Sequence, residues 1–152
     1  MSKNDGDFKK YFEENMSKLG LPVPSTLFDT YQTAIATATT LAGTLATLGK
    51  GATISELIGA TVGLEKLMVA ASIGAAAYTG AVIGSIAVAA GRSLGCGARL
   101  SDMFVFLHKH DLKFRGWNNF YLLNPQVLEP THQKRKLFAL RASTSPNSFE
   151  FA

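Results

Sequence analysis

A stretch of 25 residues without a charged side chain, Leu67 to Gly91, most constrains how this chain can fold. As one continuous helix it would be about 37 Å long, more than the roughly 30 Å hydrocarbon core of a bilayer. Its composition makes membrane insertion marginal, because 13 of its residues are Ala or Gly and only seven are Ile, Leu or Val. The stretch therefore predicts a helix that either inserts with the help of partners or is buried inside a folded domain.

Small residues recur through this stretch and the segment before it at four-residue steps. Because small side chains let another helix backbone approach closely, such rows predict helix packing, in lipid above all. A second row, Ala77, Ala81, Ser85 and Ala89, runs parallel to the first. The predicted helix-packing zipper consists of Gly59, Gly63, Ser72, Ala76, Gly80 and Gly84.

The segment from Thr26 to about Leu48 predicts a helix with two different faces. Apolar residues from Leu27 onward follow alternating gaps of four and three, a heptad seam, and Ser25 is placed to act as the N-cap. About a quarter turn away lies a row of threonines. Their hydroxyls either bond back to the carbonyl four residues earlier or form the uncharged wall of a channel. The candidate pore-lining residues are Thr30, Thr33, Thr37, Thr40, Thr44 and Thr47.

A tight turn, "LGKGAT" at residues 48–53, separates the threonine-rich helix from a second predicted helix. Thr53 and Glu56 form a capping box, and the helical pattern continues from there to about Ala90. Residues 25–91 thus predict an Ala/Gly-rich helical hairpin. If it spans a membrane, the flanking basic residues place both of its ends on the cytoplasmic side.

The first 24 residues predict a short amphipathic helix and an extended, proline-containing linker. Asp7 is placed to cap this helix, and Gly20 with Pro22 marks its end. The helix either packs on the protein's own core or lies at a membrane interface. This segment lacks the apolar region of a cleaved signal peptide, so we expect a protein that is made in a cytoplasm and is not exported by a cleaved N-terminal signal. The apolar positions at helical spacing are Phe8, Tyr11, Phe12, Met16 and Leu19.

Residues 92–152 carry nine basic side chains against four acidic ones. Their excess of five positive charges is larger than the net charge of the whole chain, which is +4. Such asymmetry suits an anionic surface, either phospholipid headgroups or nucleic acid. No nucleic-acid-binding motif accompanies it, and we expect no nucleic-acid partner. Ser101 is placed to cap a short helix through about His110, whereas "RGWNNF" and "LNPQVLEP" predict turns.

Aromatic residues are concentrated in the same C-terminal segment. They suit a membrane-interface belt, with Arg92, Arg99 and Trp117 as the candidate interfacial residues. Alternatively, they form a cap that covers the hairpin in the folded protein. The aromatic residues are Phe104, Phe106, Phe114, Trp117, Phe120, Tyr121 and Phe138.

The residues that could carry catalysis or bind a metal form no recognisable site in the sequence. On a helix, His108 and His110 point about 200° apart and cannot share a metal ion. Cys96 with His108 could be a thiol nucleophile and its base, but no orienting group or hydrolase signature accompanies them. We therefore expect no enzymatic activity, no cofactor and no metal.

These patterns predict a mainly α single domain over residues 1–152: an amphipathic helix and linker at 1–24, the hairpin at 25–91, and a short aromatic and basic C-terminal cap at 92–152. With "GATVG" at 59–63 and "GAVIG" at 80–84, the hairpin resembles small glycine-zipper pore-forming toxins of bacteria, in particular effectors of type VI secretion systems. The resemblance implies synthesis in the bacterial cytoplasm and secretion without a signal peptide, carried by the haemolysin-coregulated protein tube. It also implies insertion into a rival cell's inner membrane, self-association, ion leakage and a cognate immunity protein.

Two other interpretations remain open at this point. One is a resident two-span membrane protein, holin-like or an assembly factor. The other is a soluble helical adaptor or a cysteine-dependent hydrolase that buries the Ala/Gly helix. Under the toxin hypothesis, Gly80→Leu with Gly84→Leu is expected to abolish conductance and to leave the folded protein intact.

Overall fold

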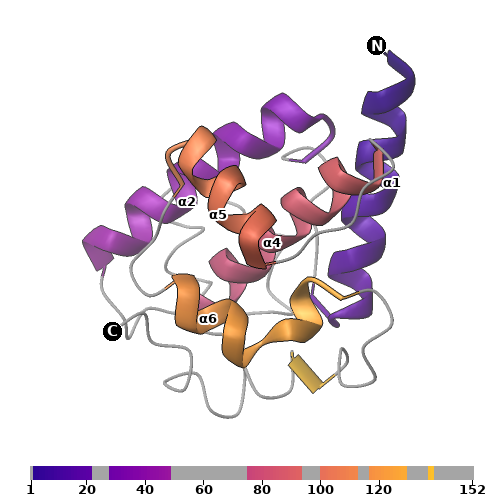
Figure 1. Cartoon of the computed structure of the whole chain (residues 1–152). Helices are drawn as coiled ribbons and strands as arrows, with labels where there is room; N and C mark the ends of the chain where they lie inside the picture. The colour runs from indigo at the N-terminus through magenta and orange to yellow at the C-terminus, as the bar shows by residue number, and fades with distance from the viewer. Residues whose placement is uncertain are drawn as a thin grey trace.

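The computed structural model describes residues 2–21, 28–48, 75–93, 100–112, 117–129 and 137–138. Within these ranges the chain is mainly helical and contains no strand, which confirms the predicted fold class. The tight turn and Gly59, Gly63, Ser72, Cys96 and Arg99 lie outside the described residues. The elements are α1 (Ser2–Lys18), α2 (Tyr31–Leu48), α4 (Ala75–Ser93), α5 (Leu100–Lys109), α6 (Trp117–Leu123) and the 3₁₀-helix η3 (Pro125–Val127) (Figure 1).

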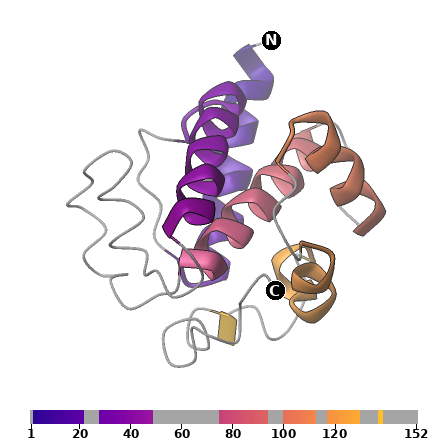
Figure 2. The same cartoon turned by 90° about the vertical axis from the view of Figure 1, so that its left-hand side faces the viewer.

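Helix α4, the C-terminal part of the uncharged stretch, is the centre of the fold. Every residue from Ala76 to Ala89 is buried. A helix that is apolar on all sides needs cover on all sides. Helices α1 and α2 pack against α4 on one side, and α5 and α6 lie on the other (Figure 2). Among the described helices, none combines the length and the hydropathy that crossing a membrane requires.

Helix α1 lays its apolar face along α4, as the amphipathic pattern predicts. Phe8, Phe12 and Met16 are buried. The helix ends at the predicted glycine: Gly20 has a φ of 79°, and the amide of Leu21 donates to the carbonyl of Met16 over 3.0 Å. This bonding closes the helix and needs the left-handed conformation that glycine adopts without strain. The predicted cap at Asp7 is wrong, because the helix continues through the polar residues before it and begins at Ser2.

Helix α2 begins later than the heptad pattern predicts. Residues 28–30 form a bend, and the hydroxyl of Thr30 accepts a hydrogen bond of 3.1 Å from the amide of Thr33. Thr30 is therefore the N-cap, in place of Ser25, because its side chain satisfies an amide that has no partner within the helix. The apolar seam is buried at Ala34, Ala38 and Leu41, and the helix ends at Leu48 as predicted.

The C-terminal segment contains more helix than the sequence indicates. Helix α5 starts at Leu100, so Ser101 lies within it rather than capping it. After its last turn Asp111 adopts a left-handed φ of 55°, and the amide of Leu112 donates to the carbonyl of Leu107 over 2.8 Å. The predicted turn in "RGWNNF" is wrong from Trp117 onward, where α6 begins.

A chain of aromatic rings joins α1, the start of α2 and the end of α5. Phe12 stacks on Phe28 with centroids 4.7 Å apart, and Phe8 meets Tyr31 edge to face at 5.5 Å. Tyr31 in turn meets His110 at 5.5 Å. Because aromatic pairs bury large areas with defined geometry, this row of rings holds α1, α2 and α5 together at one end of the structure.

Candidate functional site

The glycine face of α4, formed by Gly80 and Gly84, is covered by side chains from the C-terminal segment. A Cβ atom placed on Gly80 would lie 2.4 Å from the end of the Phe120 ring. One placed on Gly84 would lie 2.5 Å from a methyl group of Val127 and 3.0 Å from the Tyr121 ring. The missing Cβ atoms therefore make the space that these side chains occupy. We call Phe120, Tyr121 and Val127 the cover.

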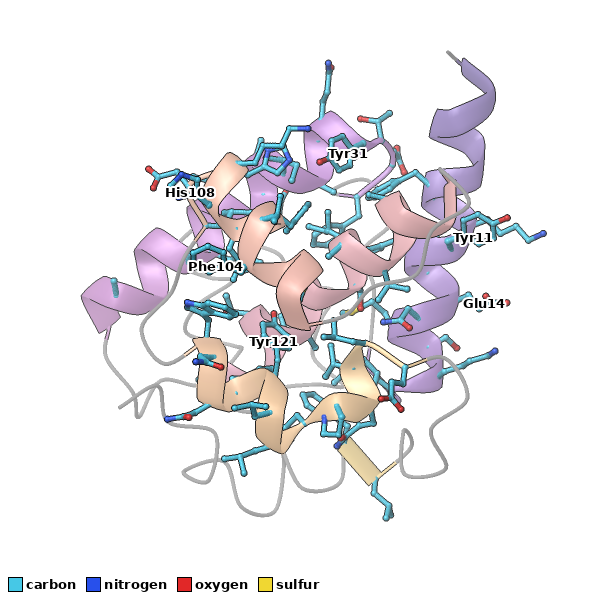
Figure 3. All side chains as sticks on the ribbon, in the orientation of Figure 1. Tyr11, Glu14, Tyr31, Phe104, His108 and Tyr121 are labelled. Atoms are coloured by element: carbon cyan, nitrogen blue, oxygen red, sulfur yellow. The ribbon has the colours of Figure 1, made fainter. Side chains whose placement is uncertain are left out.

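A hydrogen bond fastens the cover to the backbone of α4. The phenol of Tyr121 donates to the carbonyl oxygen of Gly80 over 2.6 Å, inside the core. Burial raises the pKa of Tyr121 well above its ordinary value, so the phenol stays protonated and able to donate. Phe120 meets Tyr121 edge to face at 5.0 Å, and Figure 3 shows Tyr121 between α6 and α4. The glycine face thus holds aromatic rings and a polar contact in this state.

The second small-residue row of α4 includes a polar contact with α1. The amide nitrogen of Asn15 donates to the hydroxyl of Ser85 over 2.8 Å and to the backbone carbonyl of Val127 over 3.0 Å. All three residues are buried. Asn15 therefore links α1 to both α4 and the cover, and buried polar groups bonded in this way specify how helices are aligned.

This geometry corrects the expectation for leucine substitutions on the glycine face. Leucine at Gly80 or Gly84 would displace the ring of Phe120 or the side chain of Val127, both of which are packed in the core. Overpacking of this kind costs about 1–3 kcal/mol per site. The double leucine variant is therefore not neutral for the folded protein. Of the rest of the predicted zipper, Ala76 is buried in α4.

The predicted threonine row, which begins at the N-cap of α2 and runs along that helix, is partly exposed to solvent. Thr33 and Thr40 are exposed, whereas Thr30 and Thr37 are half-buried. Thr40 donates to the carbonyl of Ala36 over 3.1 Å, the local bonding expected if the row has no channel role. For Thr44 and Thr47 the backbone lies in α2, and their side chains are outside the description.

The predicted interfacial residues are described only in part. Trp117 is half-buried, and its ring centroid lies 5.7 Å from that of Phe104 on α5. Arg92 lies in the last turn of α4, and nothing is described of its side chain. The structure thus brings Trp117 together with an aromatic residue of another helix.

The two histidines of the α5 end lie in different surroundings. The ring of His108 stacks with that of Phe104, centroids 6.3 Å apart, whereas His110 hydrogen-bonds to the phenol of Tyr31 through Nε2. Burial, and secondarily the charge of Lys109, lowers the pKa of His110. Within the described ranges no group of three potential ligands could hold a metal ion.

Sequence patterns missed two of the residues that organise this site. Asn15 lies in a polar stretch of α1, and nothing local indicates that its partners are 70 and 112 residues away. Tyr121 was identified as part of an aromatic segment, without a partner. The one sequence feature that indicates a contact for Tyr121 is the presence of both an Ala/Gly helix face and an aromatic segment in the same chain.

No protein-family model, curated protein or solved structure matches this chain.

Proposed function

We propose that this protein is a secreted antibacterial effector that inserts into the inner membrane of a target cell and forms a small ion-conducting pore. The observation that carries the proposal is that the glycine face of α4, suited to close helix packing, is occupied by aromatic side chains of a seven-residue helix. A helix this short has little stability of its own. The stability of α6 therefore depends on its contacts with α4 and η3.

The proposed mechanism has two states. In the folded state Phe120, Tyr121 and Val127 fill the glycine face. At a membrane, α6 and η3 move away, and the exposed Gly80 and Gly84 pack against α4 of another copy, since small residues drive helix association in lipid. The threonine row of α2 then lines the pore. Its hydroxyls carry no charge and would give weak selection between small monovalent ions.

The proposal includes the partners that the resemblance implies. They are the secretion tube protein that carries the effector, the lipid bilayer of the target cell and an immunity protein in the producer. The buried α4 supports carriage through water, because its uncharged face is covered until a membrane is met.

The test is release of a small dye or of potassium from anionic vesicles. Tyr121→Phe removes the hydrogen bond to Gly80 and keeps the ring, so it should speed release by loosening the cover. Gly84→Ala combined with Val127→Ala keeps the local volume of the folded protein and adds a methyl group to the zipper face. This double variant should release less than the matched control Val127→Ala. Intact vesicles with the wild-type protein over the full range of lipid ratios would refute pore formation.

The burial of every residue from Ala76 to Ala89 also favours a second candidate, a helical interaction protein in which α4 is an ordinary core helix. This candidate predicts no vesicle leakage, and it predicts that Tyr121→Phe changes stability alone. Leakage that rises with Tyr121→Phe would decide against it.

A further inference from the structure

Helices α5 and α6 lie on the side of the molecule away from α1 and α2 (Figure 2), and both expose large apolar side chains. On α5, Phe104 is 50% and Val105 64% exposed; on α6, Leu122 is 58% and Leu123 70% exposed. Exposed apolar side chains of this size on two neighbouring helices are typical of an interaction surface. We call these four residues together with Trp117 the α5–α6 surface.

The two helices are joined at this surface by aromatic contacts. Trp117 at the start of α6 lies against Phe104, and Phe104 stacks with His108. Figure 3 shows Phe104 and His108 along one side of α5. A half-buried tryptophan that packs against an exposed phenylalanine suits the boundary between headgroups and acyl chains.

Charge favours an anionic lipid surface as the occupant. Lys109 is exposed one turn from Val105 on α5. Residues 92–117, which include α5 and the first residue of α6, carry five basic side chains against two acidic ones. The exposed side chain of Lys109, next to the apolar residues of α5, adds electrostatic attraction to anionic lipids, about 1 kcal/mol near such a surface.

We propose that the α5–α6 surface is the site at which the folded protein first docks on an anionic phospholipid membrane. The inference builds on the proposed membrane target, but docking requires no pore. Docking here brings the membrane to α6, which carries Phe120 and Tyr121 of the cover, while α1 and α2 face away from the lipid. The surface that recognises the membrane and the cover of α4 thus share one short helix.

Trp117 is the only tryptophan of the chain, so its fluorescence reports directly on this surface. The experiment compares vesicles of phosphatidylcholine with vesicles that contain phosphatidylglycerol, and measures sedimentation and Trp117 emission. The wild-type protein should bind the anionic vesicles more tightly, with emission shifted to shorter wavelength. Leu122→Gln with Leu123→Gln should weaken that binding about tenfold or more, because two exposed apolar side chains no longer enter the lipid.

Three further variants guard against an effect on folding. Val105→Gln on α5 should weaken binding in the same direction, and Lys109→Gln should weaken it for the anionic vesicles alone. Ala36→Gln with Ala46→Gln changes two exposed residues of α2 and should leave binding unchanged. Thermal unfolding confirms that each variant is folded.

The outcomes separate this inference from the proposed function. Anionic-vesicle binding with a Trp117 shift but without leakage supports docking and refutes pore formation. If the folded Leu122→Gln, Leu123→Gln variant binds anionic vesicles as tightly as the wild type, docking at this surface is refuted. Leakage caused by that variant would then still support pore formation. Absence of binding to either kind of vesicle also refutes docking and assigns the surface to a protein partner.

Discussion

The phenol of Tyr121 donates a hydrogen bond to the backbone carbonyl of Gly80, 41 residues earlier in the chain, in a fully packed interior. The contact joins the helix that most needs cover to the helix that supplies it. Removing the hydroxyl with Tyr121→Phe should lower the free energy of unfolding by about 1 kcal/mol, the usual net worth of a buried hydrogen bond. Urea denaturation measures this. An unchanged midpoint would show that the bond does not hold the cover.

The close packing of Gly80 against Phe120 can be tested by enlarging the first side chain and shortening the second. Gly80→Ala should destabilise the fold, because the new methyl group meets the Phe120 ring, despite the higher helix propensity of alanine. Phe120→Leu shortens the facing side chain, so the double variant should be more stable than the sum of the single changes by about 1 kcal/mol. Additive effects would contradict the contact.

Gly43 provides the matched control for this experiment. It lies exposed in α2, and a Cβ placed there meets nothing within 4 Å. Gly43→Ala should therefore stabilise the protein by about 0.5–1 kcal/mol, since only the propensity term changes.

Asn15 should be the most sensitive polar residue of the interior. Asn15→Ala removes both donated bonds and leaves the carbonyl of Val127 and the hydroxyl of Ser85 buried without this donor, at a cost of about 2 kcal/mol. Ser85→Ala removes one bond and should cost about half as much. A double-mutant cycle in thermal or urea unfolding measures the coupling between the two residues, and zero coupling would exclude the contact.

Thr79 is the opposite case, a polar group whose removal should help. Its hydroxyl is buried, and among the described residues it is the one buried side-chain polar atom without a hydrogen-bond partner. Thr79→Val replaces the hydroxyl by a methyl group of similar size and should raise the free energy of unfolding by about 1 kcal/mol. Thr79→Ser keeps the hydroxyl and loses the methyl group, so it should destabilise. The order Val, Thr, Ser in unfolding midpoint is the expected result.

His110 should make the stability depend on pH below neutrality. Burial lowers its pKa in the folded protein from the ordinary value of 6.5, so the folded state prefers the neutral ring. The unfolded chain then binds the proton first as the pH falls. Stability from this group is complete above about pH 6.5 and is lost as the pH drops through the lowered folded pKa. His110→Gln should flatten the wild-type curve in that interval, and equal slopes for the two proteins would contradict the assignment.

The sequence predicts those helices whose apolar periodicity and end residues can both be recognised within the helix and its immediate neighbours. The end of α1 at Gly20 follows from a glycine in the left-handed conformation, and the end of α2 at Leu48 follows from the glycine that comes next in the chain. Helix α6 was missed because "WNNFYLL" contains two asparagines and few strong helix formers. Its helix is held by Phe120 and Tyr121 against α4, which no local pattern expresses.

For the candidate site, the sequence predicts a close approach to Gly80 and Gly84 but not what approaches. A missing Cβ leaves room for a helix backbone or for an aromatic ring, and the choice depends on residues 40 positions away. The same holds for Thr30. Its place in a periodic row suggested a shared face, whereas its hydroxyl is used as a helix cap.

The cover also has a consequence for biosynthesis. A ribosome completes α1, α2 and α4 well before it reaches Tyr121 and Val127, so the growing chain carries the glycine face of α4 without the side chains that fill it. Contacts that close over such sequence distances form late. The interval between emergence of Gly80 and emergence of Val127 from the ribosome is a period in which this face is open to aggregation, or to a chaperone that holds the chain.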